Sequence, residues 1–205
     1  MTSWRQSAAV MPSLLRALPR AQLGAGAIGA LGVVWLLSDE PQSARTLLAL
    51  QAAALMLSLA VASIFDDPAS DTVAAVPLTL MLRRTLTLAL ALPLVVVAWT
   101  GGVWLSGVAA GFAGAMTLQM GALILVTLAL AARLGRGGMS AGALVVLMFF
   151  GLQAAVPAWV IAPDFGDGRW DAIWVGLAAG ALFTLLLVSR DPAHRRRRLT
   201  LRRSE

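Results

Sequence analysis

Six long apolar runs, separated by short polar connections, make up most of the chain. Each run is about 18 to 24 residues long, and a helix of that length crosses a hydrocarbon core about 30 Å thick. Aspartate and glutamate are absent from the runs, and arginine occurs only at run ends, as Arg45 and Arg133. The pattern predicts an all-α integral membrane protein with six transmembrane helices. The runs cover residues 21–38, 45–65, 85–107, 114–133, 140–162 and 172–189.

The composition supports the same class of protein. Hydrophobic residues make up 59% of the chain and charged residues 13%, against about half and about a quarter in soluble domains. The first run should remain as a membrane span and not be removed as a signal peptide, because the sequence WLLSDEP at its end lacks a small-residue cleavage pattern. We therefore expect a multi-pass transmembrane domain over residues 21–189.

The arginines predict the orientation of this domain. If the six runs cross the membrane in turn, fourteen arginines lie on one side and only Arg45 and Arg169 lie on the other. Such an excess marks the cytoplasmic side, so both termini are predicted to be cytoplasmic. The chain has no lysine, which suggests a GC-rich bacterial genome and hence the bacterial plasma membrane. The fourteen are Arg5, Arg16, Arg20, Arg83, Arg84, Arg133, Arg136, Arg190, Arg195, Arg196, Arg197, Arg198, Arg202 and Arg203.

Tryptophans and the two terminal segments fit this orientation. Residues 1–20, which contain SAAVMPSLLRALPR, are predicted to form a cytoplasmic or interfacial amphipathic helix. Residues 190–205 form a basic cytoplasmic tail that is expected to contact anionic membrane lipids, not nucleic acid. Six of the seven tryptophans cluster toward the outer ends of the runs, as an aromatic belt would: Trp35, Trp99, Trp104, Trp159, Trp170 and Trp174.

Several kinds of chemistry are excluded by the residues. The chain has no cysteine, and its single histidine, His194, lies in the basic tail. The sequence GAGAIG at 24–29 has the spacing of a dinucleotide fingerprint but lies inside an apolar run, where small residues permit close helix packing. No P-loop sequence is present, so this chain is not expected to bind ATP, a metal or another cofactor itself. No catalytic residue is predicted.

Two groups of aspartates leave a membrane enzyme open as an alternative. Carboxylates are the ligands that Mg²⁺ prefers, and a prenyl or phosphatidyl transferase would use them to hold a metal and a diphosphate. The group Asp66, Asp67 and Asp71 is the candidate site. The second group lies three runs further along and should emerge on the opposite side of the membrane, so the two cannot share one metal. Its members are Asp164, Asp167 and Asp171.

Polar and small residues inside the runs mark further candidate positions. Gln51, Gln119 and Gln153 are the strongest polar groups in the runs, and they are candidates for a substrate path or for contacts between helices. Small residues predict surfaces for close helix contact, namely Gly107, Gly111 and Gly114 in one region and Gly176 and Gly180 in another. An accessory membrane subunit, with these faces as assembly surfaces, is the second alternative.

The connection after the second run, FDDPASDTVAAVPLTLMLRR at 65–84, resembles a known element. It has an acidic start, a threonine, a short hydrophobic stretch, a proline and a basic pair. This order is similar to the cytoplasmic coupling elbow of ABC-2-type permeases, the membrane subunits of ATP-driven exporters. Asp71 stands where the family has glycine, and the threonine-to-proline spacing is about three residues shorter. The stretch 133–160 also resembles small permeases of the haem-exporter B type.

The resemblance implies a permease subunit that works with a separate ABC ATPase, which would carry the ATP and Mg²⁺. It also implies a second permease copy or a homologue as a partner. The elbow between the second and third helices would contact the ATPase. The residues carried over to this coupling role, together with the neighbouring apolar positions, are Asp67, Thr72, Val73, Val76, Pro77, Leu78, Leu80, Arg83 and Arg84.

Overall fold

In the computed structural model of the chain, the described residues are 19–41, 43–65, 80–134, 138–155 and 169–188. Over these ranges the regular secondary structure is entirely helical, and each predicted apolar run overlaps one α-helix; the part of the run 140–162 after Ala155 lies outside the described residues. The prediction of an all-α fold is therefore confirmed. The elements are α2 (Arg20–Leu37), α3 (Ala44–Ala62), the 3₁₀ turn η1 (Ser63–Phe65), α4 (Leu80–Ser106), α5 (Ala110–Leu134), α6 (Gly138–Ala155) and α8 (Arg169–Val188).

Among the described residues, four helices are long and apolar enough to cross a membrane. They are α2, α3, α4 over Thr85–Ser106, and α5. The remaining two contribute shorter apolar stretches, Met139–Gly151 in α6 and Asp171–Leu186 in α8. Helices satisfy their own backbone hydrogen bonds, which is the condition for a segment that crosses lipid. The fold is compatible with a helical membrane protein, and the sixfold crossing stays a prediction.

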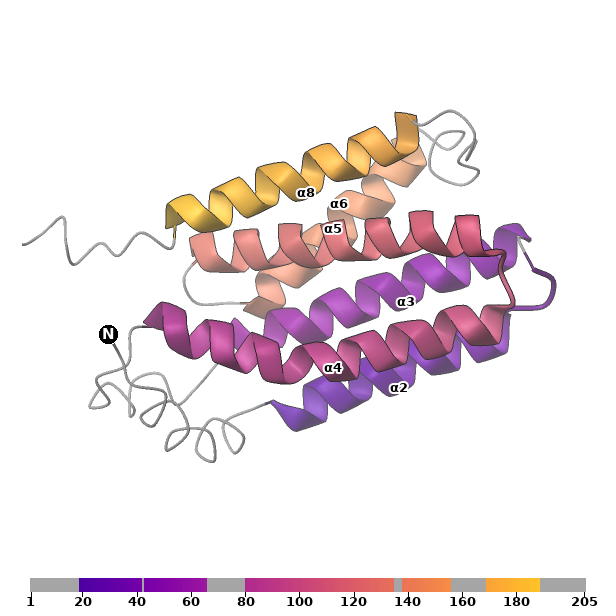
Figure 1. Ribbon diagram of the computed structural model, residues 1–205, viewed down its shortest axis with the longest axis horizontal. Helices are drawn as coiled ribbons and strands as arrows, with labels where there is room; N and C mark the ends of the chain where they lie inside the picture. Colours follow the sequence, from indigo (N-terminus) through magenta and orange to yellow (C-terminus); the bar gives the residue numbers. More distant parts are fainter. Residues whose placement is uncertain (1–18, 42, 66–79, 135–137, 156–168, 189–205) are drawn as a thin grey trace, which may run out of the picture.

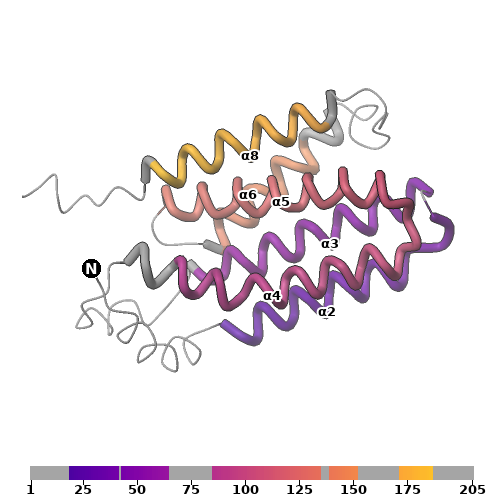
Figure 2. The backbone as a smooth tube through the Cα atoms, in the orientation of Figure 1, coloured from indigo at the N-terminus to yellow at the C-terminus, as the bar shows by residue number. Residues whose placement is uncertain are grey.

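The helices form an antiparallel bundle in which successive elements run in opposite directions (Figures 1 and 2). One end of the bundle holds the starts of α2, α4 and α6 and the ends of α3, α5 and α8; we call it the arginine end. Arg20 opens α2 and Arg133 lies in the last turn of α5, so both belong to this end. Arg45 and Arg169 lie at the starts of α3 and α8, at the far end. The helix directions thus agree with the arginine split that predicts the orientation.

Helices α3 and α5 lie at the centre of the bundle. α3 packs against α2, α4, α5 and α6, whereas α8 packs chiefly on α5. The outer helices present large apolar side chains to their surroundings, among them Ile28, Val97, Leu147 and Phe183. An apolar exterior around a tightly packed interior is what a lipid environment requires.

Close contact between neighbouring helices depends on glycine at two positions. A Cβ atom at Gly26 of α2 would collide with the Cβ of Ala60 on α3 and lie 3.3 Å from the Met56 carbonyl oxygen. A Cβ atom at Gly142 of α6 would lie 2.6 Å from Cδ2 of Leu59. Both glycines therefore let another helix approach the backbone of α3, which explains how α3 is so fully enclosed.

A hydrogen-bonded connection joins α2 to α3 at the far end. The Ser43 Oγ accepts a hydrogen bond from the Thr46 N–H at 3.1 Å and so caps α3. The Arg45 guanidinium donates to the Asp39 carboxylate at 3.1 Å. Loss of hydration raises the pKa of Asp39, but the hydrogen bonds from Arg45 and the Glu40 N–H outweigh it, so this pKa lies below its ordinary value. This turn is built from charges that suit an aqueous surface.

Candidate functional site

Three of the predicted coupling residues lie near the start of α4. Leu80, Arg83 and Arg84 belong to the backbone of this helix, which begins at Leu80 and not at residue 85 as the apolar run predicted. The helix extends into the predicted elbow because Leu80, Met81 and Leu82 continue its apolar composition. The other coupling residues lie outside the described residues: Asp67, Thr72, Val73, Val76, Pro77 and Leu78.

The predicted polar positions inside the bundle are found on its central helices. Gln51 lies on α3 and Gln119 on α5, two helices that pack together, and their exposed fractions are 3% and 1%. Gln153 belongs to the backbone of α6, and its side chain is not among the described ones. The structure therefore places two of the three candidate glutamines in the protein interior, where the sequence expected them.

Gln119 is unusual among these buried groups. Neither its Oε1 nor its Nε2 atom has a hydrogen-bond partner among the described residues. By contrast, the hydroxyls of Ser58 and Thr127 donate to the carbonyls of Ala54 and Leu123 on their own helices. An unpaired buried amide is costly, by roughly 1–3 kcal/mol. Within the described part of the bundle, the Gln119 amide therefore carries a desolvation cost that no hydrogen bond offsets.

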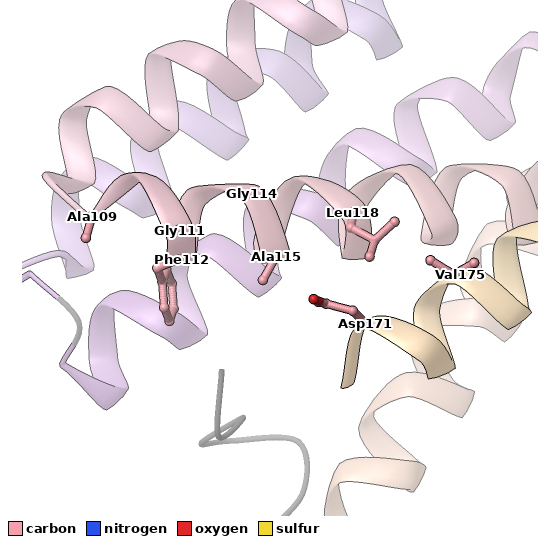
Figure 3. A pocket seen from close by; sticks show the side chains of 8 residues that line it. All are labelled: Ala109, Gly111, Phe112, Gly114, Ala115, Leu118, Asp171 and Val175. Atoms are coloured by element: carbon pink, nitrogen blue, oxygen red, sulfur yellow. The ribbon is translucent and has the colours of Figure 1, made fainter. Parts of the chain in front are cut away.

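A groove opens between α5 and α8 at the far end of the bundle, with a volume of about 690 Å³ (Figure 3). Gly111, Gly114 and Leu118 line it from α5, and Asp171 and Val175 line it from α8. The sequence grouped Asp171 with the aspartates of a connection. The structure places it in the first turn of α8, where a carboxylate is favoured by the helix dipole.

The predicted glycine surfaces divide into three kinds. Gly26 and Gly29 contact α3, which confirms helix packing for GAGAIG. Gly107 is a turn residue and not a helix-contact position: its φ of 63° lies in the left-handed region, where glycine joins α4 to α5. The other predicted positions have no described atom within 4 Å of where a Cβ would lie, so these faces are open. They are Gly111, Gly114, Gly176 and Gly180.

The tryptophans fit the predicted belt only in part. Trp35 and Trp104 point outward near the far end, with exposed fractions of 71% and 82%, as belt residues would. Trp99 and Trp174 are buried in the bundle. The Trp99 Nε1–H donates to Thr117 Oγ1 at 2.9 Å and so links α4 to α5. Position along a run could not distinguish a lipid-facing ring from a packed one.

No cluster of three potential metal ligands occurs within the described ranges. The two aspartate groups lie mostly outside those ranges, so the magnesium-enzyme alternative stays open. The helices that flank the two aspartate groups give indirect evidence on the magnesium-enzyme alternative. α3 ends and α4 begins at the arginine end, whereas α6 ends and α8 begins at the far end (Figure 1). The helix ends that flank the two aspartate groups therefore lie at opposite ends of the bundle, as the sequence predicted.

Comparison of the chain with protein-family models, curated proteins and solved structures found no match.

Proposed function

We propose that this chain is the membrane-spanning permease subunit of an ATP-driven exporter of the ABC-2 type, working with a separate ATPase. The observation that carries the proposal is the site of the connection between α3 and α4. Both flanking helix ends lie at the arginine end of the bundle (Figure 1). A connection whose sequence resembles a coupling elbow thus leaves from and returns to the end that the positive-inside rule assigns to the cytoplasm.

In this mechanism the ATPase moves α4 through the elbow. Arg83 and Arg84 would hold the start of α4 at the lipid head groups, while the apolar residues of the elbow bind a groove in the ATPase. α4 packs against α2 and α3, so a displacement at its start would be transmitted to the central helix. ATP and Mg²⁺ belong to the partner ATPase.

The same proposal includes a second permease copy, and α8 offers a surface for it. Ala172, Gly176 and Gly180 are exposed and spaced four residues apart, so they form one stripe along the helix. The buried residues Trp174 and Ala181 lie on the opposite side of α8, against the rest of the bundle. A stripe of small residues that faces outward is a surface on which another membrane helix can pack closely.

The test of the proposed function is recovery of an ATPase with the detergent-solubilised chain. Val73→Asp/Val76→Asp should reduce this association at least roughly tenfold, because buried anchors commonly contribute more than about 1 kcal/mol each. Leu199→Asp/Leu201→Asp makes the same chemical change in the basic tail, on the same predicted side, and should leave recovery unchanged. Equal recovery of an ATPase by the wild type and the Val73/Val76 variant would remove the elbow from the mechanism.

A further inference from the structure

The groove between α5 and α8 combines apolar walls with a single charge. Among the described residues that line it, Asp171 alone is ionisable. In Figure 3 its carboxylate points across the hollow toward Ala115 and Leu118 of α5. Gly111 and Gly114 leave space in the wall that larger side chains would fill. A ligand that suits this groove is therefore apolar over most of its surface and carries a positive charge at one end.

A second polar group lies deeper along α5. Phe112 and Ala115 both line the groove, and Gln119 follows them by seven and four residues, which places it on the same side of α5 but beyond the residues that line the groove. This side chain is buried and its amide atoms are unpaired within the described part of the chain. Gln119 does not itself line the groove, so among the described lining residues Asp171 carries the charged group that a ligand there can reach.

We propose that the α5–α8 groove binds an amphipathic ammonium compound. The ammonium group pairs with the Asp171 carboxylate, and the apolar portion lies along Gly114 and Leu118. The amine can belong to a membrane lipid head group or to a soluble amphipathic cation. This inference goes beyond the proposed function, since binding by the purified chain requires no ATPase.

Direct binding of a fluorescent amine tests the proposal. Dansylcadaverine carries an ammonium group, an alkyl chain and a sulfonamide, and its fluorescence reports transfer from water to an apolar site. The purified full-length chain in nanodiscs of phosphatidylglycerol should bind it saturably. Asp171→Asn should weaken binding by roughly tenfold to a hundredfold, the range for a hydrogen bond to a charged group. Gly114→Leu should weaken it by filling the groove.

Matched controls separate this site from non-specific uptake. Asp39→Asn removes another carboxylate at the same end of the bundle, outside the groove, and should bind the amine as the wild type does. The N-acetylated probe lacks the charge and should bind at least tenfold more weakly. Thermal unfolding of Asp171→Asn reports whether a loss of binding comes from a loss of fold, because Asp171 also lies in the first turn of α8.

The outcomes are distinct. Competition between phosphatidylethanolamine in the nanodisc and the probe would identify the occupant as an amine-bearing lipid. If the probe binds and phosphatidylethanolamine does not compete with it, the occupant is a soluble amphipathic cation. Absence of saturable binding by the wild type would overturn the proposal. Equal binding by a folded Asp171→Asn variant, or by the acetylated probe, would do the same. None of these results depends on the Val73/Val76 experiment, so the two proposals can fail separately.

Discussion

Replacing Gly26 by alanine should destabilise the bundle, whereas the same change at Gly24 should not. The added methyl group at Gly26 would overlap the Cβ of Ala60 and lie 3.3 Å from the Met56 carbonyl oxygen. Gly24, on the same helix, has no described atom within 4 Å of the same position. The Ala60 Cβ is fixed to the α3 backbone and cannot rotate away. α2 must therefore move relative to α3 to admit the methyl group.

The expected size of the effect follows from two opposing terms. Overpacking of a tight contact costs about 1–3 kcal/mol. Glycine-to-alanine changes gain up to about 1 kcal/mol of helix propensity in water, and this gain is common to both positions. The difference in free energy of unfolding between the Gly24→Ala and Gly26→Ala variants therefore isolates the contact, and it should be about 1–3 kcal/mol.

The measurement is reversible unfolding of the purified chain in detergent by increasing fractions of sodium dodecyl sulfate, followed by tryptophan fluorescence. A second change, Ala60→Gly, removes the atom that the new methyl group meets. The double variant Gly26→Ala/Ala60→Gly should recover much of the lost stability, which gives a coupling energy of at least about 0.5 kcal/mol. If both single alanine variants unfold at the same detergent fraction, the close contact between α2 and α3 is refuted.

Two further predictions concern topology and assembly. The chain has no native cysteine, so an impermeant thiol reagent added to intact cells should label Glu40→Cys and not Ser70→Cys; the reverse result would invert the predicted orientation. Gly176→Leu/Gly180→Leu should weaken self-association of the chain in detergent or nanodiscs, measured by cross-linking or light scattering, because leucine side chains hold a partner helix away from α8. Gly24→Leu/Gly32→Leu is the matched control on α2, and loss of association in that variant alone would place the contact there.

The helices could be predicted from the sequence because long apolar runs leave few alternatives in lipid. The start of α4 was harder to place: Leu80 is apolar enough to continue the helix, but Arg83 and Arg84 lie between it and the apolar run. Gly107 resembled a packing glycine because it lies among small residues of the sequence, and only its φ identifies the turn.

Features that depend on how each helix is rotated about its own axis could not be predicted from the sequence. Trp99 and Trp104 lie near the same end of α4, yet one is buried and the other faces outward. Asp171 could not be associated with Gly114, because the groove between them depends on how α8 packs on α5. The sequence did carry a signal for this site, namely small residues on α5 and a carboxylate at the start of an apolar run. Without knowledge of how α8 packs on α5, these residues could not be assigned to one site.

The packing also constrains how the two proposed sites can communicate. α2, α3 and α4 pack together as one group, and α5 packs with α6 and α8 as another. The described contacts between the groups are made chiefly by α3 with α5 and α6, and by the hydrogen bond from Trp99 to Thr117. The proposed elbow acts on α4 in the first group, and the proposed groove lies in the second. Coupling carried by the described residues should therefore pass through the contacts of α3 with α5 and α6, or through the hydrogen bond between Trp99 and Thr117.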